Sequence, residues 1–224
     1  MLNILLVVLS ECTQLTIPAT FSNFQGRKLD LLTTRNTFKT MLFKVLQQYL
    51  DPLWNGHYLW ADTQKHQLHL FTMHSLGFSL RKTYLFSSSR MPQSCVHNSL
   101  GTPYGLHRIC EKIGDTVPLH GVFKYRHFTG VICPPSTHKS ACGFITTRIL
   151  RLQGLEMAKN RGCNAQKFCC DTYKRTVYIH GTSLENFIPQ PLSWGCILLS
   201  NADMLDLFNA TYEGDYLYIT PPNE

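Results

Sequence analysis

The alternation of hydrophobic and polar positions predicts short strands over most of the chain after residue 57. Apolar and aromatic residues gather in short runs bounded by turn-forming residues at YLWAD (58–62), HQLHLFT (66–72), FSLRKTYLF (78–86), FITTRILRL (144–152) and RTVYIH (175–180). Runs of this length and composition are typical of β-strands. The pattern therefore predicts a mainly β fold.

Two segments carry helical signals instead. In TFKTMLFKVLQQYL (37–50), apolar residues recur at helical spacing. This helix is expected to end at Asp51, because the following Pro52 disfavours helix in the residue before it. A second helix is expected to begin at Ser200, since Ser200 with Asp203 three residues later forms a capping-box-like start before an apolar run.

The same pattern suggests three parts of the chain. Residues 1–20 contain an apolar run at 2–9 and read as a signal peptide or membrane anchor, although no Lys or Arg precedes the run. The run is too short to span a bilayer. Residues 21–52 form a helical extension that is too short to fold alone, and residues 53–224 form the main β domain with one or two helices packed against it.

The net charge narrows the class of partner. A formal charge of +7 indicates an anionic partner, such as nucleic acid, an anionic membrane face or an acidic wall polymer. Lys and Arg are scattered without a run of five, so a nucleic-acid-binding arm is not indicated. Peripheral association with a membrane is compatible with this charge. The sequence does not indicate an oligomeric state.

The chain has nine cysteines, an odd and high number. Together with the export-like N-terminus, this number predicts that some of them form disulfides, which persist in oxidising compartments. No pair has the C-x-x-C spacing. Cys163, Cys169 and Cys170 followed by His180 match structural zinc spacing poorly, so no metal site is predicted.

The stretch from Tyr178 to Cys196 carries candidate chemistry. On a strand, Thr176, Tyr178 and His180 would share one face. Gly181 would allow the chain to turn, and a loop with two prolines would bring it back to Cys196, beside His180. An imidazole there could take the thiol proton, and the thiolate could attack an acyl carbon. From spacing alone, two ordinary residues of a β-rich core remain the alternative.

Several segments together resemble the L,D-transpeptidase catalytic domain family. That family carries a strand ending in His-Gly, a loop, and then Ser-His-Gly-Cys. The matching residues here are Tyr178, Ile179, His180, Gly181, Thr182, Ser193, Gly195, Cys196, Ile197, Asn201 and Asp203. GTPYGLHRI, TTRILRLQGLE and LWADTQKHQLHLF resemble upstream segments of the family, so the similarity extends over residues 57 to 212. The resemblance implies a β-sandwich or barrel.

The resemblance also implies roles. Cys196 would be the nucleophile toward a tetrapeptide stem of peptidoglycan, and His180 the base and later the acid. Gly181 would orient His180, and backbone N–H groups at Gly195 and Cys196 would stabilise the oxyanion. Candidates for substrate binding are Ser193, Trp194, Thr182, Tyr178 and Arg148. The alternatives are turn capping for Ser193 and Thr182, packing for Tyr178, and an exposed strand position for Arg148. The resemblance implies no metal or organic cofactor, and a location in the cell envelope or periplasm.

Two positions depart from the family pattern. The histidine before Gly-Cys is Trp194 here, and the arginine two residues after the cysteine is Leu198. If the missing histidine only shapes the pocket, Trp194 can supply an aromatic wall. If it shares the proton transfer, the activity is weak or absent, and the alternative is a wall-binding or structural protein. A papain-like protease fits poorly, because there the cysteine precedes its histidine in the chain.

Overall fold

The computed structural model describes residues 56–74, 77–139 and 143–222. The helix expected at 37–50, the apolar run at 2–9, Cys12 and Cys142 lie outside the described residues. The described residues 56–71, 80–139 and 143–222 belong to one compact unit.

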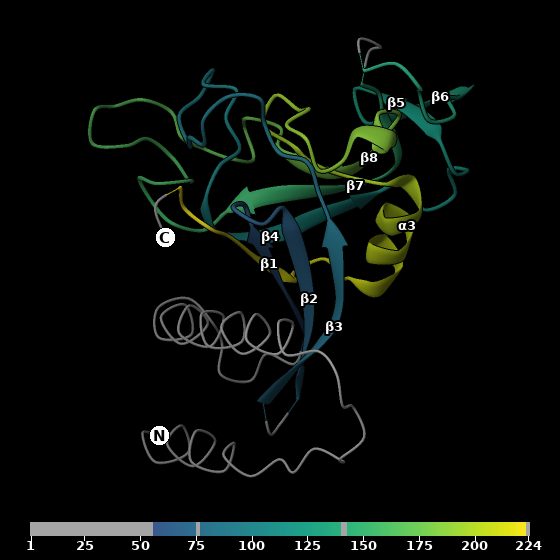
Figure 1. Cartoon of the computed structure of the whole chain (residues 1–224). Coiled ribbons are helices and arrows are strands. Elements are labelled where there is room, and N and C mark those ends of the chain that lie inside the picture. Colours follow the sequence, from purple (N-terminus) through teal and green to yellow (C-terminus); the bar gives the residue numbers. More distant parts are fainter. Residues whose placement is uncertain (1–55, 75–76, 140–142, 223–224) are drawn as a thin grey trace. The chain divides into compact units, whose positions relative to one another are not determined.

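Ten strands form one mixed sheet in the described part of the chain (Figure 1). The strands are β1 (His57–Asp62), β2 (Gln67–His74), β3 (Gly77–Leu85), β4 (Gly105–Ile113), β5 (Gly121–Lys124), β6 (His127–Ile132), β7 (Ile145–Gly154), β8 (Tyr178–Thr182), β9 (Ile197–Leu199) and β10 (Tyr216–Ile219). Their order is β3-β2-β1-β10-β4-β7-β5-β6, and β8 pairs with β7 and β9. The pairs β1–β10 and β8–β9 are parallel. The predicted mainly β class is confirmed.

The predicted strands occur with shifted ends. The segment at 175–180 becomes strand only from Tyr178, because Arg175 and Thr176 close turns onto Asp171 and Tyr173 and Thr176 has φ +55°. The predicted shared face of Thr176 with Tyr178 and His180 is therefore wrong for Thr176. Strands β4, β5, β6 and β10 were not predicted as strands.

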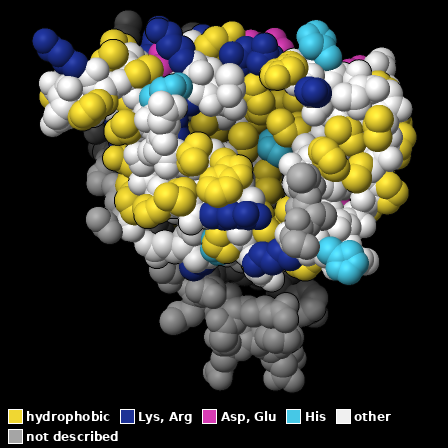
Figure 2. Space-filling model, turned by 90° about the horizontal axis from the view of Figure 1, so that it is seen from above, with side chains coloured by type: hydrophobic (Ala, Val, Ile, Leu, Met, Phe, Trp, Pro, Cys, Tyr) yellow, Lys and Arg dark blue, Asp and Glu magenta, His cyan; other side chains and the backbone are white. Residues whose placement is uncertain are grey.

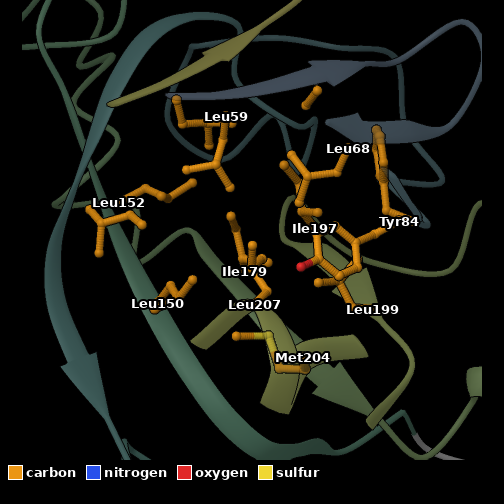
Figure 3. Close-up of a cluster of buried hydrophobic side chains, with 14 of the residues drawn as sticks. Leu59, Leu68, Tyr84, Leu150, Leu152, Ile179, Ile197, Leu199, Met204 and Leu207 are labelled. Carbon is orange, nitrogen blue, oxygen red and sulfur yellow. The ribbon is translucent and has the colours of Figure 1, made fainter. Parts of the chain in front are cut away.

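The main hydrophobic core is formed by residues of strands β1 to β4 and β7 to β10 and of the helix α3 (Asn201–Ala210) (Figures 1 and 3). Figure 3 shows Ile179 of β8 beside Leu207 of α3, and Ile197 of β9 near Leu68 and Tyr84. The side chains of four core residues are 0% exposed: Ile179, Ile197, Met204 and Leu207. Burying each of them contributes roughly 1.5–3 kcal/mol to the stability of the fold. The two strands of the candidate site are therefore anchored from behind by the core.

Helix α3 begins as the sequence predicts. The Ser200 Oγ accepts a hydrogen bond from the Asp203 N–H at 3.1 Å and donates to the Asp203 carboxylate at 2.9 Å. This cap satisfies a backbone donor that would otherwise be unpaired at the helix start, an interaction worth about 1 kcal/mol. It fixes the direction in which the chain leaves β9.

Three buried histidines are neutral in the folded chain. His69, His107 and His180 are 3%, 0% and 5% exposed, and burial lowers the pKa of each to about 4. In His107, Nδ1 lies 2.9 Å from the Gly105 carbonyl and Nε2 lies 3.1 Å from the Thr172 hydroxyl. A neutral ring satisfies both contacts, with Nδ1 donating and Nε2 accepting.

We expect the free energy of unfolding to fall as pH drops below about 6.5, because the unfolded chain then binds protons that the folded histidines do not. The full stability is present above about 6.5, and each histidine removes about 1.4 kcal/mol per pH unit down to about 4. Urea unfolding at pH 7.5, 5.5 and 4.5 measures this slope. His107→Gln should reduce the slope, and an equal slope in the variant and the wild type would contradict the assignment.

Candidate active site

The parallel pairing of β8 with β9 sets the positions of the two candidate catalytic residues. Ile179 pairs with Ile197, and His180 pairs with Leu198. Extending this register by one residue places Cys196 beside Tyr178, and paired residues of a sheet point to the same face. The Tyr178 N–H donates to the Cys196 sulfur at 3.4 Å, and Cys196 packs against the cluster that contains Tyr178. Cys196 therefore shares the face of Tyr178 and His180.

The ring of His180 has a fixed orientation. Its Nδ1 lies 2.8 Å from the Gly181 carbonyl, which can only accept a hydrogen bond. The neutral ring therefore carries its proton on Nδ1 and leaves the lone pair of Nε2 free. Burial lowers the pKa of His180 to about 4, while the contact with Gly181 opposes this shift. Near neutral pH, His180 is an unprotonated base.

Gly181 is required for close packing rather than for a turn. The expectation that the chain turns at Gly181 is wrong, because β8 continues to Thr182. A Cβ atom at Gly181 would lie 2.8 Å from the Thr146 carbonyl oxygen and 2.9 Å from the Asn201 Oδ1. Asn201 also accepts hydrogen bonds from the hydroxyls of Thr146 and Thr147 and donates to the Thr182 carbonyl. This buried network supports the strand that carries His180.

The sulfur of Cys196 is protonated at rest. Burial raises the pKa of the thiol to about 11, although the Tyr178 N–H and the charge of Arg175 lower it. Besides the contact with Tyr178, the thiol lies 4.0 Å from the Thr176 carbonyl. In the described residues no hydrogen bond joins the sulfur to His180. The resting pair is therefore a thiol and a neutral imidazole, not an ion pair.

The turn before Cys196 depends on Gly195 and Ser193. Gly195 has φ +127°, in the left-handed region that favours glycine, as expected from the sequence. The Ser193 hydroxyl donates to the Cys196 carbonyl at 2.6 Å and accepts from the Gly195 N–H at 3.2 Å. In the resting site the Gly195 N–H is thus engaged by Ser193. Ser193 caps the turn.

Two cavities open on either side of Cys196. The His180 cavity, of about 420 Å³, is lined by Arg90, Gly143, Ile145, His180, Thr182, Leu192, Ser193, Trp194, Cys196 and Leu198. The Arg175 cavity, of about 330 Å³, is lined by His97, Asn98, Leu100, Ile145, Arg175, Thr176, Val177, Tyr178, Trp194 and Cys196. Figure 2 shows hydrophobic side chains around a hollow on the upper face, with Lys and Arg nearby. Neither cavity is lined by Asp or Glu.

Comparison with known proteins assigns the chain to a family. The family model described as the L,D-transpeptidase catalytic domain (YkuD) matches residues 56–219. The chain belongs to the L,D-transpeptidase catalytic domain family. This family acts on peptidoglycan. A search of curated proteins found no match.

Solved structures with a similar fold have low sequence identity to the chain. Bd1075 of Bdellovibrio bacteriovorus is 13% identical, with a TM-score of 0.45, over 76% of this chain and 49% of that protein. The K307A mutant of the helical cell shape determining protein Pgp2 from Campylobacter jejuni is 12% identical, with a TM-score of 0.49, over 83% of this chain and 55% of that protein. An L,D-transpeptidase of Mycobacterium smegmatis is 15% identical, with a TM-score of 0.42, over 74% of this chain and 58% of that protein. The chain spans about half the length of these proteins.

The two departures from the L,D-transpeptidase motif have different surroundings. Trp194 is 59% exposed, lines both cavities and stacks against Arg90, whose guanidinium carbon lies 5.4 Å from the ring centre. Leu198 is 4% exposed and packs with Leu184 and Leu192. Trp194 therefore forms a wall of the site, and Leu198 belongs to a small hydrophobic cluster.

The other predicted substrate-binding residues of the L,D-transpeptidase domain differ in placement. Thr182 lines the His180 cavity, but its hydroxyl accepts from the Leu184 N–H at 3.1 Å and caps a turn. Tyr178 lines the Arg175 cavity, and its hydroxyl accepts from Arg126 at 3.3 Å. Arg148 lines neither cavity. The structure does not bring it to the site, because its guanidinium donates to the carbonyls of Asp115, Val117 and Thr147.

Three residues at the site of this L,D-transpeptidase domain were missed from the sequence. Arg90 lines the His180 cavity. Arg175 and His97 line the Arg175 cavity. Arg175 lies five residues before His180, so its closeness to the motif was the one available signal. Arg90 is brought in because its N–H donates to the Ser193 carbonyl, which no local pattern reveals.

Other expected features concern metals, disulfides and the membrane. In the part of the chain that the structure describes, no group of His, Cys, Asp or Glu could hold a metal ion. The seven described cysteines are all unpaired, so the disulfides expected from the sequence are not formed among them. No helix in the described ranges is long and apolar enough to cross a membrane.

We expect alkylation of Cys196 by iodoacetamide to accelerate about tenfold per pH unit between pH 7 and 9, because only the thiolate reacts and its pKa lies near 11. No inflection is expected near pH 6.5, because His180 is already neutral there. Mass spectrometry of the Cys196 peptide measures the rate. A plateau below pH 8 would instead indicate a resting ion pair.

Proposed function

We propose that the protein is a cysteine-dependent L,D-transpeptidase that acts on tetrapeptide stems of peptidoglycan through a thioester intermediate. The observation that carries this proposal is the placement of Cys196 and His180 on one face, lining one cavity. Family membership supplies the substrate class. The products are a cross-link, or exchange or trimming of the terminal D-amino acid.

The reaction follows from the free lone pair of His180. The Cys196 sulfur attacks the carbonyl carbon before the terminal D-amino acid, while the His180 Nε2 takes the thiol proton. The tetrahedral intermediate then expels the D-amino acid, whose amine receives that proton from His180. An amine of a second stem then attacks the thioester carbonyl carbon and gives a proton to the His180 Nε2. The C–S bond breaks, and the sulfur receives that proton, which restores the thiol.

The protonation states decide when the proton moves. A thiol with a pKa near 11 does not lose its proton to an imidazole with a pKa near 4 before substrate binds. The transfer therefore accompanies attack on the carbonyl, as general-base catalysis. This differs from a cysteine enzyme with a preformed thiolate–imidazolium pair.

The oxyanion requires a donor other than Gly195. We assign this role to the Cys196 N–H, since the Gly195 N–H donates to Ser193. One such donor is worth about 3–4 kcal/mol in a studied protease. Trp194, at the junction of the two cavities, would form the wall that contacts both the donor and the acceptor stem.

The charge of the site suits this substrate. Arg90 and Arg175 are the charged residues that line the two cavities, and both are positive. Peptidoglycan stems carry carboxylates, and the chain has a net charge of +7. An anionic wall polymer in the cell envelope or periplasm is therefore the partner that we propose, with no nucleic acid involved.

A wall-binding or structural role without catalysis is the second candidate. The motif histidine is Trp194 here, and an indole is only a hydrogen-bond donor. The resting thiol is also neutral. A member that keeps the fold and binds stems without cleaving them would retain both cavities.

We expect the intact protein to gain the mass of one carbapenem after incubation with this thioester-forming mimic. Cys196→Ala should gain none, because the acylated sulfur is absent. Intact-protein mass spectrometry makes the comparison. An adduct that persists in Cys196→Ala would place acylation elsewhere, and release of the terminal D-amino acid from a tetrapeptide stem separates an enzyme from a binding protein.

We also expect His180→Ala to slow carbapenem acylation about 10²-fold or more, the usual effect of losing a positioned acid–base group. Stopped-flow or quenched mass measurements give the rate. His97→Ala provides the matched control, because His97 lines only the other cavity. An unchanged rate in His180→Ala would show that another group accepts the proton.

A further inference from the structure

Arg175 is a partly buried cation without an anionic partner. Its guanidinium donates to the carbonyls of Ser94 at 2.8 Å and Gly101 at 2.6 Å, and to the Ser99 hydroxyl at 3.4 Å. These three acceptors are neutral. Among the described residues, no Asp or Glu forms an ion pair with Arg175. Burying a charge is costly unless an opposite charge compensates it.

The guanidinium lies close to the candidate nucleophile. Arg175 and Cys196 line the same cavity. A Cβ atom on Gly195, the residue before Cys196, would lie only 4.0 Å from the Arg175 Nη2. The three hydrogen bonds to the 94–101 loop hold the charge in this position.

The charges around the sulfur favour an anion. The positive charge of Arg175 lowers the pKa of Cys196. Burial lowers the pKa of Arg175, and the thiols of Cys95, Cys196, Cys169 and Cys170, with Cys95 first, oppose this shift. The other titratable groups near the sulfur are His180 and Tyr178 on β8, with Arg126 on the Tyr178 hydroxyl, and His97 across the cavity. The guanidinium of Arg90 lies against the ring of Trp194, which lines the cavity beside Cys196. No carboxylate lines either cavity.

We propose that Arg175 is a positioning residue that holds a positive charge beside Cys196, and so favours the thiolate and the anion formed during attack. The motif arginine is replaced by the buried Leu198, so β9 carries no cation of its own. Arg175 supplies one from the turn before β8. This inference rests on the proposed role of Cys196, but its test requires no peptidoglycan activity.

The test measures alkylation of Cys196 in the full chain by iodoacetamide, followed by mass spectrometry between pH 7 and 9. Arg175→Gln should slow the reaction about tenfold at each pH. Removing a positive charge close to a thiol raises the pKa of that thiol by about one unit, which lowers the thiolate fraction by the same factor. Arg175→Lys should remain within about threefold of the wild type, because it keeps the charge while losing the planar hydrogen-bonding fork. Lys174→Gln, a neighbouring exposed charge, is the matched control and should leave the rate unchanged.

The reagent's own charge separates an electrostatic role from a structural one. With anionic iodoacetate, the loss in Arg175→Gln should exceed the loss with neutral iodoacetamide, and 0.5 M salt should reduce the difference. The proposal is overturned if Arg175→Gln matches the wild type. Equal losses in the Gln and Lys variants with both reagents would also overturn it, since they would mean that Arg175 only holds the loop.

A measurement without an Arg175 variant covers the case in which Arg175→Gln does not fold. In Arg90→Gln, Arg175 is the arginine that remains in the cavities. The iodoacetate to iodoacetamide rate ratio at Cys196 should then stay above that of free N-acetylcysteine and fall with salt. A ratio equal to that of N-acetylcysteine would overturn the proposed role of Arg175. Failure to turn over a tetrapeptide stem would count against the proposed function, and not against the role of Arg175.

Discussion

The parallel pairing of β8 with β9 is the constraint on which the candidate site depends. It sets Cys196 beside Tyr178 and on the face of His180, although a loop separates the two residues in the chain. The pairing is held from behind by Ile179 and Ile197, which are completely buried. The chemistry on one face of these strands therefore depends on hydrophobic packing on the other.

The sequence predicted strands whose apolar runs stand out from their neighbours, and it missed β4, β5, β6 and β10, although the short β10 alternates between half-buried and buried residues. Strand β1 reads as a strand because its short apolar run is buried in the sheet. All six residues of β6 are exposed, so no alternation distinguishes it from a loop. The parallel pairing of β1 with β10 joins opposite ends of the domain, which no local pattern can indicate.

At the site, motif residues could be predicted and supporting residues could not. His180, Cys196 and the Ser200 cap follow from local sequence, and the structure brings the first two to one cavity. Arg175 was read as part of a strand, but the left-handed backbone of Thr176 turns it toward the 94–101 loop. Arg148 was read as a surface or substrate-binding residue, although it is buried and its two terminal nitrogens donate to backbone carbonyls.

The replacement of the motif histidine by Trp194 affects shape more directly than proton transfer. The free lone pair belongs to His180, whose other nitrogen is fixed by Gly181. Trp194 instead lines both cavities and lies against Arg90. A change at this position therefore alters the walls that a donor and an acceptor would meet, while the base stays in place. The substitution removes a second titratable group beside a neutral thiol, and the Tyr178 N–H and the positive charge of Arg175 are the groups that lower the pKa of the Cys196 thiol.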